Sequence, residues 1–489
     1  MSLTLAYNIA RGALASNAAT ASVVSRNLAN AENPDASRKT ALLVTDATGG
    51  VHVAGVANEV EAALLEQSLK STSASSHSAE VAKVLQTLSA VVGDPELEGS
   101  PAALIGQFRS ALQTAAASPH DTTSLQGVLS SAEALTESLN SAAELTTSTR
   151  RVAQDTIETA VGDLQSLLGA FSDLNREIVT GTALGRDVTD QLDRRNSLLR
   201  GIADLVDIRT QERSDGDMAI FLANGTVLFE TSARSISFDG NAALLPGQPG
   251  SALRIDGVPQ TDGESLGGKI GGLLVVRDEL TLELGSQLDE IARGLIVATS
   301  ESDQSASPSG PAQAGLFTYP GGPGLPASGS VAVGLASSIS VNANANPALG
   351  GALERIRDGG ISDPGDPRYV YNAGSLPGYA GRLNELIDGL SADQPFASSV
   401  SVSVTNGGVL AFATASAGWL EGERSTSSAD SEQKRLLADK AAGAWQSEAG
   451  VNLDDELSAL MALERSYQAS TRLISAVNSM FDALLSAVR

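Results

Sequence analysis

The chain has 489 residues, which allows two to four domains at the usual ~100–200 residues each. Its formal net charge is −25 at pH 7, which argues against wrapping nucleic acid or lying on an anionic membrane, because both need a basic surface. It contains no cysteine and only three histidines, so thiol catalysis, disulfides and cysteine-bound metals are excluded, and a histidine-rich metal centre is not expected. Aromatic residues make up 3% of the chain, which favours close helix packing over an aromatic-lined pocket.

The first thirty residues show apolar or small side chains at alternating steps of three and four. This spacing predicts a helix that Asn30, Asn33 and Pro34 then end. The same segment lacks the apolar core of a secretory signal, so we expect that a chain leaving the cytoplasm does so without a cleaved signal peptide.

The middle of the chain is predicted to be mostly helical. Three- and four-residue spacing of apolar side chains indicates helices through residues 157–178, 188–205 and 269–297. From Val206 the period changes to two, and Asn224-Gly225 is a strong hairpin signal, so residues 206–265 are predicted to form an inserted β domain.

Two later segments have weaker patterns. Residues 300–350 are rich in Gly, Ser and Pro, which predicts an extended loop with short strands at 331–341. Asn406-Gly407 between Val400–Val404 and Val409 predicts a second hairpin, with helix resuming at Trp419.

The C-terminal segment has the clearest pattern in the chain. Apolar residues at three- and four-residue steps run from Leu453 to Val488, which predicts one helix roughly 54 Å long. Asn452 stands at the N-cap position, and Asp454, Asp455 and Glu456 fall in the first turn, where carboxylates favour the positive end of the helix dipole.

Both terminal helices carry a narrow apolar stripe, which is typical of a coiled-coil seam. Residues 1–45 have a charge of +2 and residues 450–489 a charge of −2, so the whole negative charge belongs to the part between them. We therefore predict a mainly α protein with an inserted β domain, in which long terminal coiled-coil helices pair with each other beside a rod-like helical body. The expected divisions are the N-terminal half of the coiled-coil domain, a helical body, the β domain, the returning helical body and the C-terminal half, at residues 1–45, 46–205, 206–265, 266–449 and 450–489.

Motifs that would support catalysis do not match. Gly267–Gly272 contains Gly-Gly-Lys but lacks phosphate-loop spacing, and Gly374–Gly378 places serine second rather than third, so it is not a nucleophile elbow. No histidine lies in an HExxH motif. The sequence therefore predicts no catalytic, cofactor-binding or metal-binding residue, and we do not expect an enzyme.

Two segments resemble a known family. The run from Ser25 to Pro34, Ser-Arg-Asn-Leu-Ala-Asn-Ala-Glu-Asn-Pro, resembles the signature of flagellar rod, hook and hook-associated axial proteins. The segment from Gly450 to Leu485 is similar to the C-terminus of the hook-associated protein 1 family, the first hook–filament junction proteins. One departure is Asp35-Ala36, where the family usually has Gly-Tyr. The residues that carry the resemblance are Asn27, Asn30, Pro34, Asn452, Tyr467 and Phe481.

The resemblance implies a structural protein that connects hook to filament. It implies a ring of subunits, contacts with the hook protein and the second junction protein, and an export chaperone that holds the C-terminal helix. It also implies an extracellular location in the flagellum, reached through the flagellar secretion apparatus. No nucleic-acid or membrane partner is expected.

The stripe residues of both terminal helices are the predicted assembly interface. They are Leu3, Tyr7, Leu14, Val24, Leu28, Leu453, Leu460, Leu463, Tyr467, Ile474, Val477, Phe481, Leu484 and Val488. Alternatives are a flagellin-like filament protein, a distal junction protein, or a secreted enzyme carried on flagellar termini, which would need the missing HExxH motif.

Overall fold

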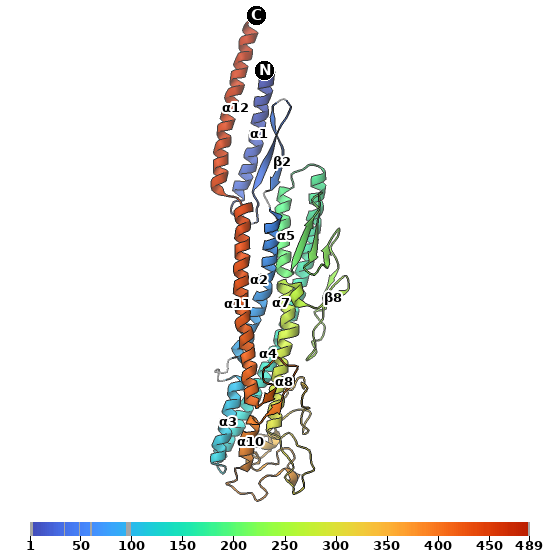
Figure 1. Cartoon of the computed structure of the whole chain (residues 1–489), viewed down its shortest axis with the longest axis vertical. Coiled ribbons are helices and arrows are strands. Elements are labelled where there is room, and N and C mark those ends of the chain that lie inside the picture. The colour runs from blue at the N-terminus through green and yellow to red at the C-terminus, as the bar shows by residue number, and fades with distance from the viewer. Residues whose placement is uncertain (1–2, 34, 48, 59–60, 94–98, 488–489) are drawn as a thin grey trace.

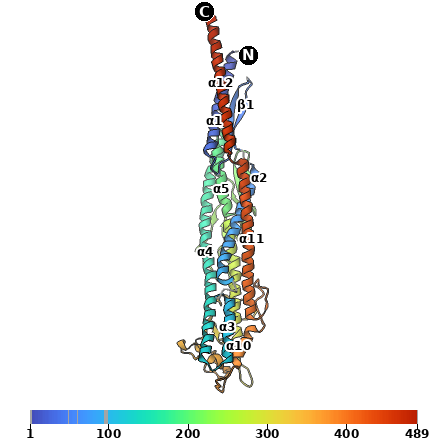
Figure 2. The same cartoon turned by 90° about the vertical axis from the view of Figure 1, so that its left-hand side faces the viewer.

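The protein is long and narrow, and both termini lie at the same end (Figure 1). The computed structural model describes all residues except 1–2, 34, 48, 59–60, 94–98 and 488–489. The predicted interface and signature residues Val488 and Pro34 therefore lie outside the described residues. A terminal helical pair, a helical body and a loop-rich end follow one another along the long axis (Figures 1 and 2).

The terminal pair consists of α1 (Leu3–Ala29) and α12 (Leu453–Ala487), which run antiparallel and side by side. This pairing confirms the prediction that the two terminal helices pack on each other. On its other side α1 contacts an antiparallel hairpin of β1 (Lys39–Thr45) and β2 (Val51–Asn58) (Figure 1). No sequence pattern predicted this hairpin, which crosses the boundary predicted at residue 45.

The body is a bundle of helices held together by apolar contacts. Its main helices are α2 (Ala62–Leu88), α3 (Pro101–Ala117), α4 (Thr122–Ala183), α5 (Thr189–Leu205), α7 (Gly268–Val275), α8 (Thr281–Ala298), α10 (Gly381–Ser391) and α11 (Val409–Ala449). The helix α4 has 62 residues and spans about 93 Å. It begins at Asp121, whose carboxylate accepts hydrogen bonds from the backbone N–H groups of Thr123 and Ser124.

Short turns complete the helical body. Two of them are π-helical, at Ser89–Gly93 after α2 and at Val276–Leu280 between α7 and α8. Among the described residues, the remaining short helices are α6 (Gly263–Leu266), α9 (Arg355–Asp358) and three 3-10 turns at Ala343–Ala345, Pro347–Leu349 and Pro367–Tyr369. None of the helices in the described part of the chain has the length and apolar character needed to cross a membrane.

The β region contains two small antiparallel sheets beside α4. One has β3 (Ile208–Glu212), β4 (Met218–Leu222) and β5 (Val227–Phe229), and the other has β6 (Ile236–Ser237), β7 (Leu253–Ile255) and β8 (Val258–Gln260). The predicted Asn224-Gly225 turn is confirmed, and Gly225 has the positive φ of 89° that this hairpin turn requires. Phe229 packs edge-on against Phe171 of α4, with ring centroids 5.0 Å apart, so the first sheet is fixed to the bundle.

Two hydrophobic cores lie along the body. One gathers buried residues of α3, α4, α8, α10 and α11, and the other joins α4, α5, α7 and the β region. Between them Arg150 is buried on α4, and its guanidinium donates hydrogen bonds to the carbonyl groups of Arg277, Leu245 and Gln248. The long helix α4 therefore supports both cores.

The second predicted hairpin is wrong. Asn406–Gly407 forms β12, which pairs with β11 (Gln394–Pro395), and α11 begins at Val409 rather than at Trp419. Val400 and Val402 are buried in the core near α8 and α11, so tertiary packing decides their conformation. Within the strands predicted at 331–341, only β10 (Ser340–Val341) forms, paired with β9 (Phe317–Thr318).

Candidate assembly interface

One side of α12 packs along α1. Val477 and Ser470 are buried on this side, and Ile474 is half-buried one turn from Ser470. Near the middle of the pair, the Asn17 side-chain amide donates a hydrogen bond of 2.9 Å to the Ser466 hydroxyl. The spacing of buried residues on α12 agrees with the narrow seam that the sequence predicted.

The predicted interface residues divide into two groups. Those that are buried or half-buried are Leu3, Tyr7, Leu14, Val24, Leu28, Leu463, Ile474, Val477 and Phe481. Those that are exposed are Leu453, Leu460, Tyr467 and Leu484, all on α12. The single stripe therefore includes residues of the intramolecular seam and residues that face solvent.

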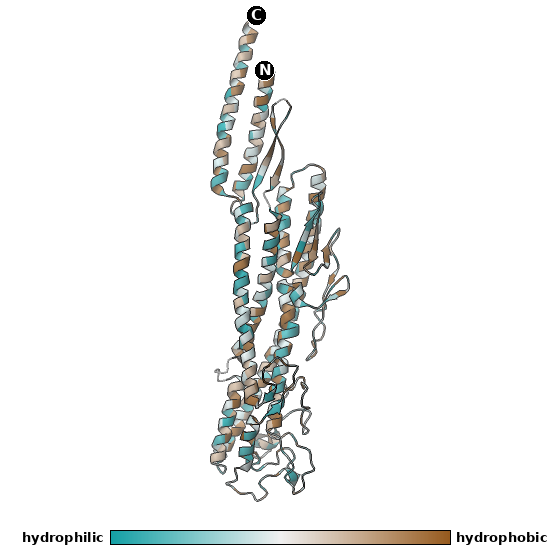
Figure 3. Ribbon diagram, in the orientation of Figure 1, coloured by the Kyte–Doolittle hydropathy of each residue, from teal (hydrophilic) through white to brown (hydrophobic). Residues whose placement is uncertain are grey.

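The exposed surface of α12 is more apolar than the stripe indicated. Of the 22 large apolar side chains that are exposed among the described residues, nine lie on α12, three on β1 and none on α1. Hydrophobic residues recur along the whole ribbon of α12 (Figure 3). Sequence reasoning missed five of them, which are Leu457, Met461, Leu473, Met480 and Leu485. A count of all apolar positions on the helix, rather than one seam, would have found them.

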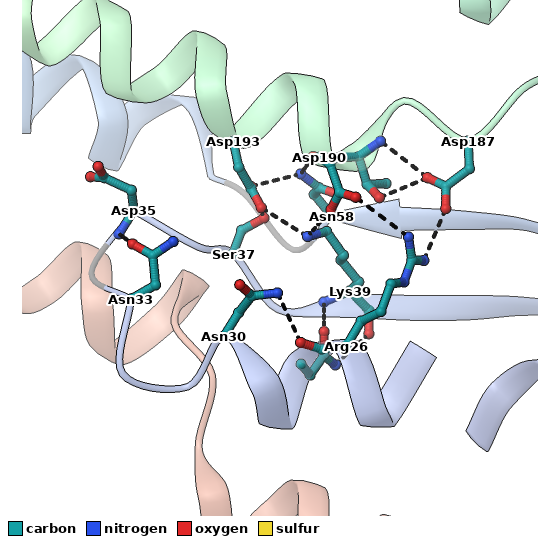
Figure 4. A network of polar contacts seen from close by, with 12 residues as sticks. Arg26, Asn30, Asn33, Asp35, Ser37, Lys39, Asn58, Asp187, Asp190 and Asp193 are labelled. Carbon is teal, nitrogen blue, oxygen red and sulfur yellow. Dashed lines mark hydrogen bonds and ion pairs between the residues drawn. The ribbon is translucent and has the colours of Figure 1, made fainter. Parts of the chain in front are cut away.

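A polar joint connects the terminal pair to the body (Figure 4). At its centre the buried Asn27 amide donates to the Lys39 carbonyl oxygen at 2.9 Å and accepts from the Lys39 backbone N–H at 3.1 Å. These two bonds join the end of α1 to the start of β1. The signature residue Asn27 thus has a structural role in the joint.

The Lys39 side chain reaches from β1 to α5. Its buried ammonium lies 2.6 Å from the Asp190 carboxylate and 3.0 Å from the Asp193 carboxylate. Burial of the ammonium opposes its charge, but hydrogen bonds to these two aspartates raise the pKa of Lys39 above its usual value. The Arg26 guanidinium adds a contact of 2.9 Å with Asp187, just before α5. Ion pairs therefore fix α1 and β1 to one end of α5 (Figure 4).

Asp35, in the turn after α1, contacts α5 directly. Its carboxylate accepts hydrogen bonds from the Arg200 guanidinium and the Ser197 hydroxyl, which lies 2.9 Å away. The Arg200 guanidinium also lies 5.7 Å from the ring centroid of Trp445 on α11. In this chain a charged contact links the turn after α1 to two body helices.

The start of α12 is held by a cap and an ion pair. The Asn452 side chain accepts a hydrogen bond of 2.9 Å from the Asp454 backbone N–H, which confirms the predicted N-cap. Glu456 is buried and lies 2.8 Å from the Arg38 guanidinium. The Arg38 backbone N–H also donates to the Ala449 carbonyl oxygen at 2.7 Å. The turn between α11 and α12 is therefore attached to the segment between α1 and β1.

Across the described part of the chain, no group of three or more His, Asp or Glu residues is arranged to hold a metal ion. The signature residue Asn30 donates a hydrogen bond to the Arg26 carbonyl oxygen, and nearby Asn33 accepts one from the Asp35 backbone N–H. Tyr467 and Phe481 lie on α12, exposed and half-buried respectively.

Comparison with known proteins gives consistent matches. Residues 85–307 match the model of the flagellar hook-associated protein FlgK helical domain, and residues 445–487 match the model of the flagellar basal body rod FlgEFG protein C-terminal region. The chain is 22% identical over 448 residues to flagellar hook-associated protein 1 of Bacillus subtilis (strain 168), a match that covers 83% of this chain and 79% of that protein.

Among solved structures, the chain is similar to the flagellar hook junction protein FlgK from Burkholderia pseudomallei. The TM-score is 0.44 and the identity 20%, over 52% of this chain and 46% of that one. The sequence matches include both the helical body and the C-terminal helix. The chain is therefore similar in sequence to flagellar hook-associated protein 1 in both its helical body and its C-terminal helix.

Proposed function

We propose that this chain is a structural subunit of the flagellar hook–filament junction and that its copies assemble through the exposed side of α12. The observation that carries the proposal is the concentration of exposed large apolar side chains on α12, beside an α1 that has none among its described residues. Soluble proteins rarely expose such surfaces unless a partner covers them. The predicted interface residues on α12 that face solvent belong to this surface.

The energetics favour a closed assembly over isolated pairs. Complete burial of nine half-exposed side chains would contribute about 7–13 kcal/mol, taking half of the usual value for each. Association costs about 4–15 kcal/mol in lost freedom of motion, so one contact is close to balance. A ring gives each subunit two neighbours. The second contact costs less additional freedom of motion, because the subunit is already held by the first. We infer that copies form a ring rather than free dimers.

The other partners follow from the same surface. The exposed side of α12 would aggregate in a cytoplasm, so a chaperone that covers this helix before export is part of the proposal. We further propose contacts with the hook protein and with the second junction protein, and export through the flagellar secretion apparatus without a cleaved signal peptide. The role is structural and includes no catalytic step.

Substitutions on α12 test the proposal. The triple variant Leu460→Ser, Tyr467→Ser, Leu484→Ser should leave cells with hooks but without filaments in electron micrographs. The reason is that serine at these three exposed positions removes the apolar surface whose burial favours assembly. The matched control is Leu436→Ser, Leu437→Ser on α11, which changes two exposed side chains of the body. Normal filaments in the α12 variant would refute assembly through this surface.

A further inference from the structure

A second exposed apolar surface lies on the hairpin beside α1. Leu42, Leu43 and Val44 of β1 are consecutive and all exposed, Leu43 by 55%, and a register shift between Leu42 and Leu43 interrupts the pairing with β2. We propose that this segment binds the outer side of α12, which carries Met461 and faces away from α1, in a neighbouring copy. Subunits then stand side by side and join head to tail, which means that two different surfaces meet at each contact. The inference rests on the proposed function and names the contact within that assembly.

Residues 40–45 of β1 carry none of the charges or prolines that usually protect an exposed strand edge. Among the described elements β1 pairs with β2 alone, which leaves its other edge open. Residues 40–45 contain no charged side chain, and Lys39 is buried in the joint. Exposed edges in soluble proteins usually carry charges or proline. An open, uncharged and apolar edge is therefore a surface at which another chain is expected to bind.

The outer side of α12 offers a matching surface. Residues 457–463 contain no charged side chain, and Met461 is 54% exposed. Met461 precedes the buried Ser470 by nine residues, which equals two and a half helical turns. Because Ser470 faces α1, Met461 points to the opposite side, away from α1. This side of α12 is free to meet a neighbour.

Two hydrogen bonds show that the hairpin and the middle of α12 lie at the same height along the long axis. The Ser16 hydroxyl donates to the Val51 carbonyl oxygen at 2.7 Å, and the Asn17 amide donates to the Ser466 hydroxyl at 2.9 Å. Ser16 and Asn17 are adjacent on α1. Val51 on one side of α1 and Ser466 on the other therefore lie at the same position along the long axis.

The two apolar surfaces are level as well. Val51 pairs with Thr45, and Leu43 precedes Thr45 by two strand residues, or about 7 Å toward the body. Met461 precedes Ser466 by five helical residues, or about 7.5 Å in the same direction. Leu43 and Met461 thus lie at nearly the same height on one molecule.

The two surfaces also lie on opposite sides of the molecule, because α1 stands between α12 and the hairpin (Figure 1). A second copy placed beside the first, without a shift along the axis, brings its α12 to the hairpin of the first. Contacts between two different surfaces repeat from copy to copy and form rings or filaments, whereas two-fold contacts stop at dimers. The occupant that fits is therefore another copy of this chain.

Disulfide cross-linking tests the contact, and the absence of native cysteine makes it specific. Leu43→Cys and Met461→Cys are placed in separate chains, co-expressed in cells without the wild-type chain, and flagella are isolated and oxidised. We expect covalent dimers that contain one chain of each kind. The control pair, Leu43→Cys with Leu436→Cys on α11, should give none. Flagella with filaments that contain both variants but no dimer would overturn the head-to-tail contact and leave the proposed function intact.

A second variant tests the hairpin without cysteine. We expect Leu42→Ser, Leu43→Ser to keep the circular dichroism and melting temperature of the wild type but to lower the number of filaments per cell at least about tenfold. Val258→Ser on β8 is the control, because it removes an equally exposed side chain from the body. Wild-type filament numbers in the hairpin variant would overturn the proposal, whereas wild-type numbers in the α12 triple variant would overturn the proposed function itself.

Discussion

Replacing Asn27 with alanine tests how the joint holds the terminal pair. The Asn27 side chain is 2% exposed and bonds both the N–H and the C=O of Lys39. Alanine leaves these two buried backbone groups without partners, at about 1–3 kcal/mol each. We expect the free energy of opening α1 to fall by about 2–4 kcal/mol, because part of the loss is recovered when water enters the joint.

Native-state amide exchange followed by mass spectrometry measures this opening directly. A fall of 2–4 kcal/mol corresponds to about 30- to 700-fold faster exchange in α1. The matched control is Asn17→Ala on the same helix, whose hydrogen bond to Ser466 is exposed and should change the opening by less than about 0.5 kcal/mol. Equal exchange rates in the two variants would refute the argument that burial makes the Asn27 hydrogen bonds contribute more to the free energy of opening α1 than the exposed Asn17 bond does.

Three further predictions concern packing, pH and dynamics. A Cβ on Gly272 would lie 2.5 Å from a backbone oxygen of α2, whereas a Cβ on Gly162 of α4 would enter open space. In urea unfolding, Gly272→Ala should therefore lower the free energy of unfolding by more than about 2 kcal/mol. Gly162→Ala should raise it by about 1 kcal/mol. The same sign for both would contradict the packing of α7 on α2. Burial raises the pKa of Asp289 from 3.8 to about 6, so folding favours the neutral acid. The free energy of unfolding of the wild type relative to Asp289→Asn should therefore increase by about 3 kcal/mol as the pH falls from 6 to 3.8, and this gain should be absent above pH 6. Denaturation at pH 7.5 and 4.0 measures the difference, and a pH-independent value would contradict it. In the free monomer, amides of α12 should exchange much faster than those of α4, because α12 has one packed side; protection equal to that of α4 would argue against a surface completed by neighbours.

The terminal helices could be predicted from the sequence because their stability depends on local features. The three- and four-residue spacing, the Asn452 cap and the acidic first turn of α12 all lie within one segment and agree with one another. The same holds for the Asn224-Gly225 hairpin, where the turn and both strands are adjacent in sequence. Local agreement of this kind is what sequence patterns report.

The hairpin of β1 and β2 could not be predicted in this way. Period-two alternation arises when one face of a strand is buried and the other is in water. Residues 42–45 of β1 are exposed on both faces, so no alternation marks them. The heptad pattern on α12 has a similar limit, because it identifies the seam with α1 and not the apolar residues, such as Met461, on the outer side.

In the proposed assembly, the joint and the outer side of α12 would make different physical contributions. Ion pairs such as Lys39 with Asp193 are directional, and desolvation offsets much of their Coulomb energy, so they fix the angle between the terminal pair and the body more than they add stability. Apolar contacts on α12 have little directional preference but scale with the area buried, so in the proposed assembly they would supply the free energy of association. The charge distribution agrees with this division, because the strongly negative bodies repel one another while the terminal segments, at +2 and −2, do not. Copies should therefore approach through their terminal pairs, with the joint setting how far the bodies stand apart.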